Sequence, residues 1–304
     1  MKLSVLSMLL LLVGAPGVGR TQDLDTTYQN LKDAEAKGDA AAVKKLAAET
    51  SALARKAAAE AAPADADEKD AWTKRVEYAK SVDAYTEYAL YDVAAKSQPA
   101  VAVELLGALE AQNPKCKYLD EGYAAYLYDL SQAGATAKIP AIAEKAVANF
   151  PENPDLLYFL AENAMAAKQN DRAQAYANRL VAAASKRAKP EGMGEADWEK
   201  RKSLQVGSGY WISGVVAGEK NQYAAADKSL RAALPYVKGN DSRTSAALFY
   251  LGLANYNLGK MTMNKAKILE GAKFSDQCAA ITGPYAEQAY KNSMVMKTEA
   301  GKMR

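Results

Sequence analysis

The sequence predicts an all-helical fold built from stacked antiparallel helix pairs. Alanine, leucine and valine are abundant in the 304 residues, which contain only 19 glycines and 10 prolines. This composition favours helices over strands, because alanine and leucine lose little conformational entropy in a helix. Apolar residues also recur at helical spacings in paired segments that are separated by short polar breaks. The length suits one large repeat domain or two ordinary domains.

Residues 1–19 predict a secretory signal peptide. Lys2 supplies a positive start, residues 3–13 form an apolar run, and small residues follow up to Gly19, after which we expect cleavage. The apolar run is too short to cross a bilayer, and no later stretch is long and apolar enough to do so. We therefore expect a periplasmic or secreted protein of a bacterial-type envelope, without a membrane span in the mature chain. The alternative is an uncleaved membrane anchor.

Residues 20–67 predict an N-terminal helical hairpin followed by a linker. The hairpin covers residues 25–61 and turns at Lys37-Gly38-Asp39, where glycine ends one helix and aspartate caps the next. The segment 59–67 is rich in alanine, proline and aspartate, which is typical of a loose connection. A long helix is expected over residues 68–97. The hairpin is interpreted either as a cap for the following helices or as a mobile arm.

A recurring helix pair is clearest in residues 153–184. Asn153-Pro154-Asp155 is typical of a helix start, because proline is preset for the first turn. Leu160 and Ala161 follow in the first helix, and residues 168–171 form a polar break. One face of the second helix then carries Ala173, Ala177 and Leu180, at helical spacing. Small residues of this kind let two antiparallel helices approach closely.

This spacing resembles the tetratricopeptide repeat, in which a small residue stands 12 places after a Gly-like position and is followed by apolar residues at +4 and +7. The positions that match the small residue are 102, 139, 173, 226 and 266. The resemblance implies a right-handed α-solenoid of about five repeats within residues 68–304. One hairpin cannot bury its apolar face alone, so several must stack. The alternative is an irregular helical bundle.

In the tetratricopeptide family the first helix of each repeat lines a concave groove that binds a protein or peptide. Carried over repeat by repeat, the resemblance places partner-binding residues at Tyr91, Tyr128, Tyr158, Glu162, Trp211, Phe249 and Tyr256. Tyrosine suits such a surface because it has an apolar ring and a polar tip, and the chain has 18 tyrosines against 4 phenylalanines. For any single member, the alternative is an interior contact between hairpins. Lys96 and Asn255 are too isolated to predict the basic clamp that some family members use for a partner's terminal carboxylate.

Residues 185–202 form a charged insertion in this pattern. Charged side chains and Pro190-Glu191-Gly192 predict a surface loop that leads into a helix start. Trp198 is the only large aromatic residue of the insertion. We interpret it as a staple that holds the insertion on neighbouring helices, with an exposed anchor for a partner as the alternative.

Cys116 and Cys278 are separated by several repeats in the predicted stack, so no disulfide between them is expected. Cys278 is interpreted as a buried thiol, and Cys116, near a turn, as the better candidate for an intermolecular bond. Two cysteines without histidine make a poor metal site, and no metal or other cofactor is predicted.

The chain contains no histidine, which excludes Ser-His-Asp and Cys-His catalysis and HExxH zinc sites. Charges of both signs are interspersed around a formal net charge of +3. This pattern lacks the basic stripe of a nucleic-acid-binding protein, so no nucleic acid is expected as a partner. Together with the predicted signal peptide, the resemblance to the tetratricopeptide repeat implies a non-catalytic exported scaffold that binds a protein or peptide.

Two alternatives stay open. One is a self-assembling structural protein, which an exposed apolar face on the final helix, expected over residues 284–296, would favour. The other is a helical-repeat hydrolase with a carboxylic acid, for which Glu162 is the candidate. Such an acid would be buried in a cleft.

Overall fold

The computed structural model describes residues 18–190 and 192–303, with side chains from residue 23 onward. Thirteen α-helices and one short 3₁₀ helix make up the regular structure of this part of the chain, which contains no strand. The all-helical prediction is confirmed for these residues. The predicted signal peptide lies outside the described residues, except for its last two positions, at which α1 begins. No helix in the described ranges combines the length and apolarity needed to cross a membrane.

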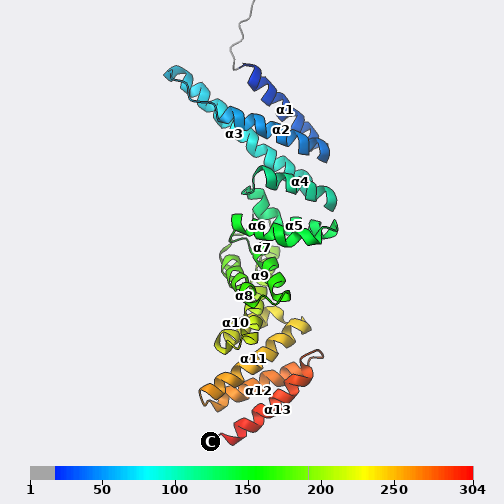
Figure 1. The fold of residues 1–304 in the computed structure, drawn as a ribbon, viewed down its shortest axis with the longest axis vertical. Helices are drawn as coiled ribbons and strands as arrows, with labels where there is room; N and C mark the ends of the chain where they lie inside the picture. The colour runs from blue at the N-terminus through cyan, green and yellow to red at the C-terminus, as the bar shows by residue number, and fades with distance from the viewer. Residues whose placement is uncertain (1–17, 191, 304) are drawn as a thin grey trace, which may run out of the picture. The chain divides into compact units, whose positions relative to one another are not determined.

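Helices α1 to α5 form the first of two compact units, which ends at Thr136. Each helix packs on the next, and helices two apart in the chain also touch, as α1 and α3 do. Figure 1 shows these helices running back and forth. The unit consists of α1 (Val18–Ala36), α2 (Ala40–Ala58), α3 (Ala66–Ala95), α4 (Pro99–Gln112) and α5 (Lys117–Gln132). The predicted hairpin, its turn and the linker before a long helix are therefore present.

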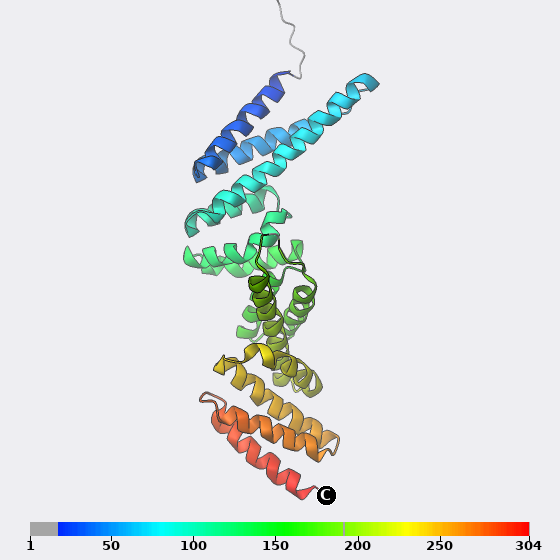
Figure 2. The same cartoon turned by 180° about the vertical axis from the view of Figure 1, so that it is seen from behind.

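Helices α6 to α13 form the second unit, from Ala137 onward. Consecutive helices again pack together, and the odd-numbered helices α7, α9, α11 and α13 contact one another in turn. The layering of α11, α12 and α13 is visible from both sides (Figures 1 and 2). The unit consists of α6 (Ile139–Asn149), α7 (Pro154–Ala166), α8 (Asn170–Lys186), α9 (Glu195–Glu219), α10 (Tyr223–Val237), α11 (Asp241–Met261), α12 (Lys265–Ala279) and α13 (Ala286–Lys302).

One type of turn follows five helices of the described residues, α1, α5, α7, α9 and α11. Its central residue has a positive φ: +65° at Gly38, +74° at Gly134, +57° at Lys168 and Asn221, and +51° at Met263. The N–H of the next residue donates to the carbonyl oxygen five residues earlier, as Gln169 does to Ala164 at 2.8 Å. This is the Schellman arrangement, which satisfies carbonyl groups at the end of a helix. The repetition of this turn means that equivalent residues enter each second helix in the same way.

The residue five positions after each of these turn centres is buried. Two further residues, four and seven places later, are buried with it. The resulting triplets are 43, 47 and 50; 139, 143 and 146; 173, 177 and 180; 226, 230 and 233; and 268, 272 and 275. The predicted position 266 is wrong, because Ala266 is exposed and Ile268 takes its place. A Cβ on Gly259 would lie 2.6 Å from Ile268 Cγ1, so the glycine makes room for the larger residue.

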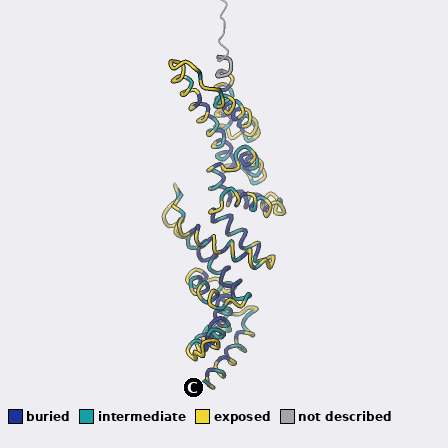
Figure 3. The backbone as a smooth tube through the Cα atoms, turned by 60° about the vertical axis from the view of Figure 1, so that its left-hand side comes forward, coloured by how far each residue is buried: buried dark blue, intermediate teal, exposed yellow. Residues whose placement is uncertain are grey.

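The interior consists of small clusters that successive helices share. Ala161, Ala173 and Ile212 belong to a cluster of α7, α8 and α9, and the next cluster, of α9, α10 and α11, includes Leu230 and Leu251. Within each unit, buried residues follow the faces between neighbouring helices (Figure 3). Burial of each leucine contributes roughly 1.5–3 kcal/mol. Stability is therefore distributed along each unit.

The predicted insertion is a loop followed by the start of α9. Helix α8 continues to Lys186, and α9 begins at Glu195. Trp198 is only 5% exposed, which contradicts the exposed anchor and agrees with the interpretation as a staple. Arg201 forms an ion pair with Asp155, which ties the first turns of α9 to the N-terminus of α7. The final helix is longer than expected, because it continues to Lys302.

Candidate functional site

Three of the predicted partner-binding residues meet in the second unit. Tyr158 and Glu162 project from α7, and Trp211 projects from α9. They converge on Arg243 of α11, whose Nη2 donates to Glu162 Oε1 at 2.8 Å and to the Tyr158 hydroxyl at 3.2 Å. The Tyr158 hydroxyl donates to the same Glu162 oxygen at 2.7 Å. We call Tyr158, Glu162, Trp211 and Arg243 the arginine cluster.

Arg243 is held on two sides by α9. Its guanidinium carbon lies 5.2 Å from the centre of the Trp211 ring, which is a cation–π contact. The indole Nε1 donates to the Arg243 carbonyl oxygen at 2.9 Å, and Arg243 Nη1 donates to Ser208 Oγ at 2.9 Å. The cluster thus links three odd-numbered helices of one unit.

Helix caps place the cluster residues. The side chain of Asn153 accepts hydrogen bonds from Asp155 N and Leu156 N, which starts α7 one turn before Tyr158. Asn240 accepts from Arg243 N at 3.0 Å and starts α11. Tyr158 and Glu162 stand four residues apart in a helix, so they share one face.

The electrostatics of the cluster favour a fixed charge pair. Burial and the hydrogen bond to Glu162 raise the pKa of Tyr158, although Arg243 acts in the opposite direction. The Tyr158 hydroxyl therefore keeps its proton and donates a hydrogen bond to the carboxylate. The side chains of Arg243 and Glu162 are 23% and 43% exposed, so Glu162 reaches the surface while Arg243 supports it from below.

A solvent-open depression of about 500 Å³ adjoins the cluster. Glu162 and Trp211 line it together with Met165, Ala166 and Lys168. Lys168 is mostly exposed and lies 3.4 Å from Glu219. The depression thus offers an apolar floor with one acidic and one basic group, an arrangement suited to a peptide side chain and its neighbours.

Phe249 and Tyr256 of α11 lie in other contacts. The Phe249 ring centre is 4.8 Å from that of Tyr285 and 5.3 Å from that of Tyr250. Tyr256 donates to Glu299 of α13 at 2.8 Å. Both residues join helices within the unit, as the alternative interpretation expects of single members of the set.

The first unit contains Tyr91 and Tyr128. Tyr91 stacks on Tyr118 of α5 at 5.4 Å between ring centres and packs against Gly122. Tyr128 is 63% exposed. Tyr91 thus lies in an interhelical contact, whereas Tyr128 points into solvent.

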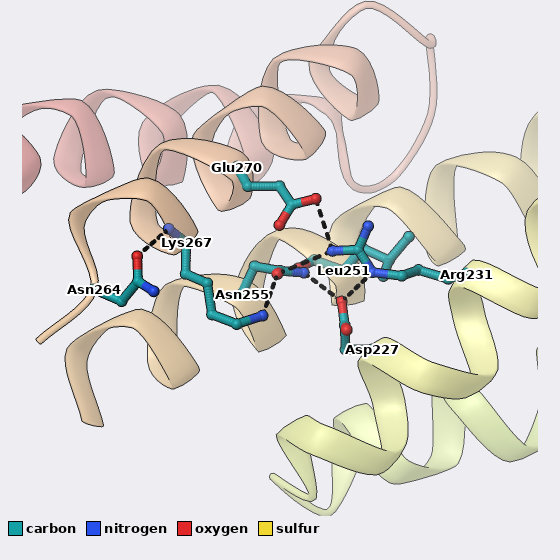
Figure 4. Close-up of polar contacts among 7 residues, drawn as sticks. All are labelled: Asp227, Arg231, Leu251, Asn255, Asn264, Lys267 and Glu270. Carbon is teal, nitrogen blue, oxygen red and sulfur yellow. Dashed lines mark hydrogen bonds and ion pairs between the residues drawn. The ribbon is translucent and has the colours of Figure 1, made fainter. Parts of the chain in front are cut away.

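A second polar cluster surrounds Asn255 (Figure 4). This side chain is fully buried. Its Nδ2 donates to Asp227 at 2.7 Å and to the Leu251 carbonyl oxygen at 3.0 Å, and its Oδ1 accepts from Arg231 at 3.1 Å. Arg231 also forms an ion pair with Glu270 at 2.8 Å. Asn255 Oδ1 also accepts from Lys267 of α12 at 3.5 Å, so Asn255 joins α10, α11 and α12, and its hydrogen-bonding groups are already used inside the protein.

Both cysteines are buried free thiols. Burial is the larger cause, and a hydrogen bond with Glu87 the next, of a pKa of Cys116 that is raised to about 12. Burial raises the pKa of Cys278 to about 11, and its thiol donates to the Ser245 carbonyl oxygen. The interpretation of Cys116 as a candidate for an intermolecular bond is wrong, because this thiol is buried and protonated near neutral pH.

Arg243, Met165, Ala166 and Lys168 are the site residues that sequence reasoning missed. Arg243 carries a usable signal, because it is a basic residue in the first turn of a helix, where the dipole favours acidic residues. Lys168 and Met165 carry none, since lysine is common in turns and methionine in helix interiors.

No family model matches the chain, and neither does any curated protein or solved structure. Within the described residues, no group of three or more cysteine, aspartate or glutamate side chains is arranged to hold a metal ion.

Proposed function

We propose that this chain is a non-catalytic scaffold that binds a protein or peptide partner through the odd-numbered helices of its second unit. The observation that carries the proposal is the arginine cluster beside its open depression. A surface carboxylate is fixed by Arg243 and Tyr158, next to an aromatic ring and a methionine. Aromatic residues and arginine are enriched where binding energy concentrates in protein interfaces.

We further propose that the helix pairs form a right-handed solenoid of the tetratricopeptide type. The repeated Schellman turn and the buried triplets that follow it support this architecture, because repeat proteins build each pair in the same way. In such a solenoid, the first helices of successive pairs would form a continuous binding face. Export to the periplasm or the cell exterior is part of the proposal and rests on the sequence of residues 1–19.

The proposal is tested with peptides selected from a random 12-residue display library on the full chain. Ala166→Trp places a large side chain in the depression from an exposed position and leaves the core unchanged. We expect this variant to weaken binding of the selected peptides at least about tenfold, which corresponds to about 1.4 kcal/mol. Fluorescence anisotropy measures the dissociation constants.

Ala224→Trp is the matched control, because Ala224 is an exposed alanine of α10. It should bind the selected peptides as the unmodified chain does. Equal affinity of the Ala166→Trp and Ala224→Trp variants would refute binding at the depression. Circular dichroism establishes that both variants fold.

A second candidate function is self-assembly, which the surface of α13 favours. Tyr290, Met294 and Val295 of this helix are 60%, 50% and 51% exposed. Tyr290 and Met294 stand four residues apart and share one face of the helix, and an exposed apolar face is typical of interaction surfaces. Light scattering over a range of concentrations separates the two functions. A concentration-independent monomer removes self-assembly, and an oligomer that Met294→Glu dissociates supports it.

The hydrolase alternative needs a buried carboxylic acid in a cleft. Glu162 is 43% exposed and forms an ion pair with Arg243. This arrangement suits a fixed negative charge that orients a partner, and it supports the binding proposal over the hydrolase.

A further inference from the structure

A hollow in the first unit lies between α2 and α4. Its volume is about 820 Å³, and Leu90 of α3 contributes to its floor. The hollow lies on the even-numbered helices, whereas the predicted groove residues lie on the odd-numbered ones. Its lining therefore contains none of the predicted partner-binding residues and no residue of the arginine cluster.

Small side chains form the walls of this α2–α4 groove. Ala48 and Ala52 come from α2, and Ala108 and Ala111 come from α4. All except Ala108, which is half-buried, are exposed. Helices approach each other most closely where alanine or glycine lines the contact, and they then pack at about 8–10 Å between axes. A groove walled by alanines therefore fits an α-helix better than it fits a bulky or branched ligand.

The charged side chains that line the groove are all basic. Lys44, Lys45 and Arg55 line it, and no carboxylate does among the described residues. Arg55 links α2 to α3 and α4, because its Nε pairs with Asp83 at 3.0 Å and its Nη2 donates to the Gln112 carbonyl oxygen at 3.2 Å. The two lysines are thus the groups that remain for a ligand.

Both lysines are paired only at the surface. Lys44 lies 3.1 Å from Glu104, whose side chain is 67% exposed, and Lys45 lies 3.9 Å from Glu49. Exposed pairs of this kind contribute about 0–1 kcal/mol. A carboxylate that enters the groove can therefore replace either partner at little cost.

We propose that the α2–α4 groove binds an amphipathic helix of a partner protein that carries acidic residues beside a stripe of small apolar ones. The alanine walls receive the apolar stripe, and Lys44 and Lys45 receive the carboxylates. Helix-in-groove binding of this kind places anchors at helical spacing. This surface is independent of the proposed function, because it lies in the other unit.

The probe is a fluorescently labelled helical peptide of about 18 residues, about 27 Å long, with alanine and leucine on one face and glutamate on its flanks. Two matched peptides carry lysine or glutamine in place of glutamate. We expect the full chain to bind the glutamate peptide about tenfold more tightly than the glutamine peptide and to reject the lysine peptide. Raising the salt concentration from 0.1 M to 1 M should remove most of this preference, since screening shortens to about 3 Å.

Two variants locate the binding. Lys44→Glu/Lys45→Glu should reverse the preference between the glutamate and lysine peptides, whereas Lys69→Glu/Lys74→Glu on α3 should not. Ala48→Trp should weaken binding of the glutamate peptide about tenfold or more, whereas Ala71→Trp on α3 should leave this binding unchanged. Circular dichroism establishes that each variant folds.

Several results would overturn the proposal. Equal binding of the glutamate and lysine peptides would do so, as would an affinity that Ala48→Trp leaves unchanged, or no binding of the glutamate peptide at about 1 mM. A dimer in light scattering that Ala48→Trp dissociates would also overturn it, because a second copy of the chain would then occupy the groove.

Discussion

Asn255 shows how one buried polar side chain specifies the packing of three helices. Its amide nitrogen donates to Asp227 of α10 and to its own helix, and its oxygen accepts from Arg231 of α10 and from Lys267 of α12. A buried amide is tolerated only where its hydrogen bonds are made, and a paired amide favours one relative position of the helices over others. Asn255 therefore acts on the relative position of α10, α11 and α12.

Replacing Asn255 by alanine should lower the free energy of unfolding. The substitution removes the amide nitrogen and the amide oxygen, so Asp227 and Arg231 each lose a hydrogen-bond partner. This loss should lower the free energy of unfolding by about 1–3 kcal/mol. Urea denaturation followed by circular dichroism measures the change. Asn257→Ala is the matched control, because Asn257 makes a single bond, to the Leu253 carbonyl oxygen. A change below about 0.5 kcal/mol in both variants would show that the network contributes nothing.

At the scale of helices, α12 and α13 are joined by a carboxylate. Asp276 accepts from Ser293 at 2.6 Å and pairs with Lys297 at 2.8 Å. Burial opposes ionisation of Asp276, but the hydrogen bonds from Lys297 and Ser293 prevail and lower its pKa. The contact therefore stabilises the protein most when Asp276 is ionised.

This shift predicts how stability depends on pH. A carboxylate with a lowered pKa in the folded state contributes stability above its unfolded pKa of about 3.9, and the contribution is lost as pH falls through the folded pKa. Asp276→Asn should be slightly less stable at pH 7, by less than about 1 kcal/mol, because the pair is half exposed. Below pH 4, the difference between the two proteins should shrink. Thermal unfolding at pH 7 and pH 3 measures both values, and a difference that stays constant or grows at pH 3 would contradict the assignment.

At the scale of each unit, local signals predict the helix pairs well. The sequence predicts a helix end at Gly38 and Asp39 and a helix start at Asn153 and Pro154, because the backbone preferences of these residues are strong. Lys168, Asn221 and Met263 adopt the same positive φ as Gly38. The turns at Lys168 and Met263 cannot be recognised from a single sequence, because the surrounding packing imposes the positive φ on these two residues.

The wrong prediction of a small buried residue at position 266 of α12 has a physical cause. Close approach of two helices requires room on only one of them. In the last pair Gly259 of α11 provides that room, so α12 packs Ile268 at the contact. A search for a small residue on the second helix therefore selects Ala266, which is exposed.

Contacts between distant segments explain what sequence could not predict about the site. The resemblance places Tyr158, Glu162 and Trp211 on the first helices of pairs, and the structure brings these three side chains together around Arg243. Arg243 was not predictable, since its bonds to Tyr158 and Glu162 join residues more than 80 positions apart. The groove between α2 and α4 was also not predictable, because exposed alanines carry no pattern that distinguishes them from ordinary helix residues.

The central claim is that a partner binds over the depression beside the arginine cluster. Hydroxyl-radical footprinting of the full chain, with and without a peptide selected on it, tests this claim at single residues. Bound peptide should lower the oxidation of Met165 and Trp211 severalfold, and leave Trp72 and Met261 unchanged as internal controls. Unchanged oxidation of Met165 and Trp211 in the saturated complex, with protection elsewhere, would contradict the account.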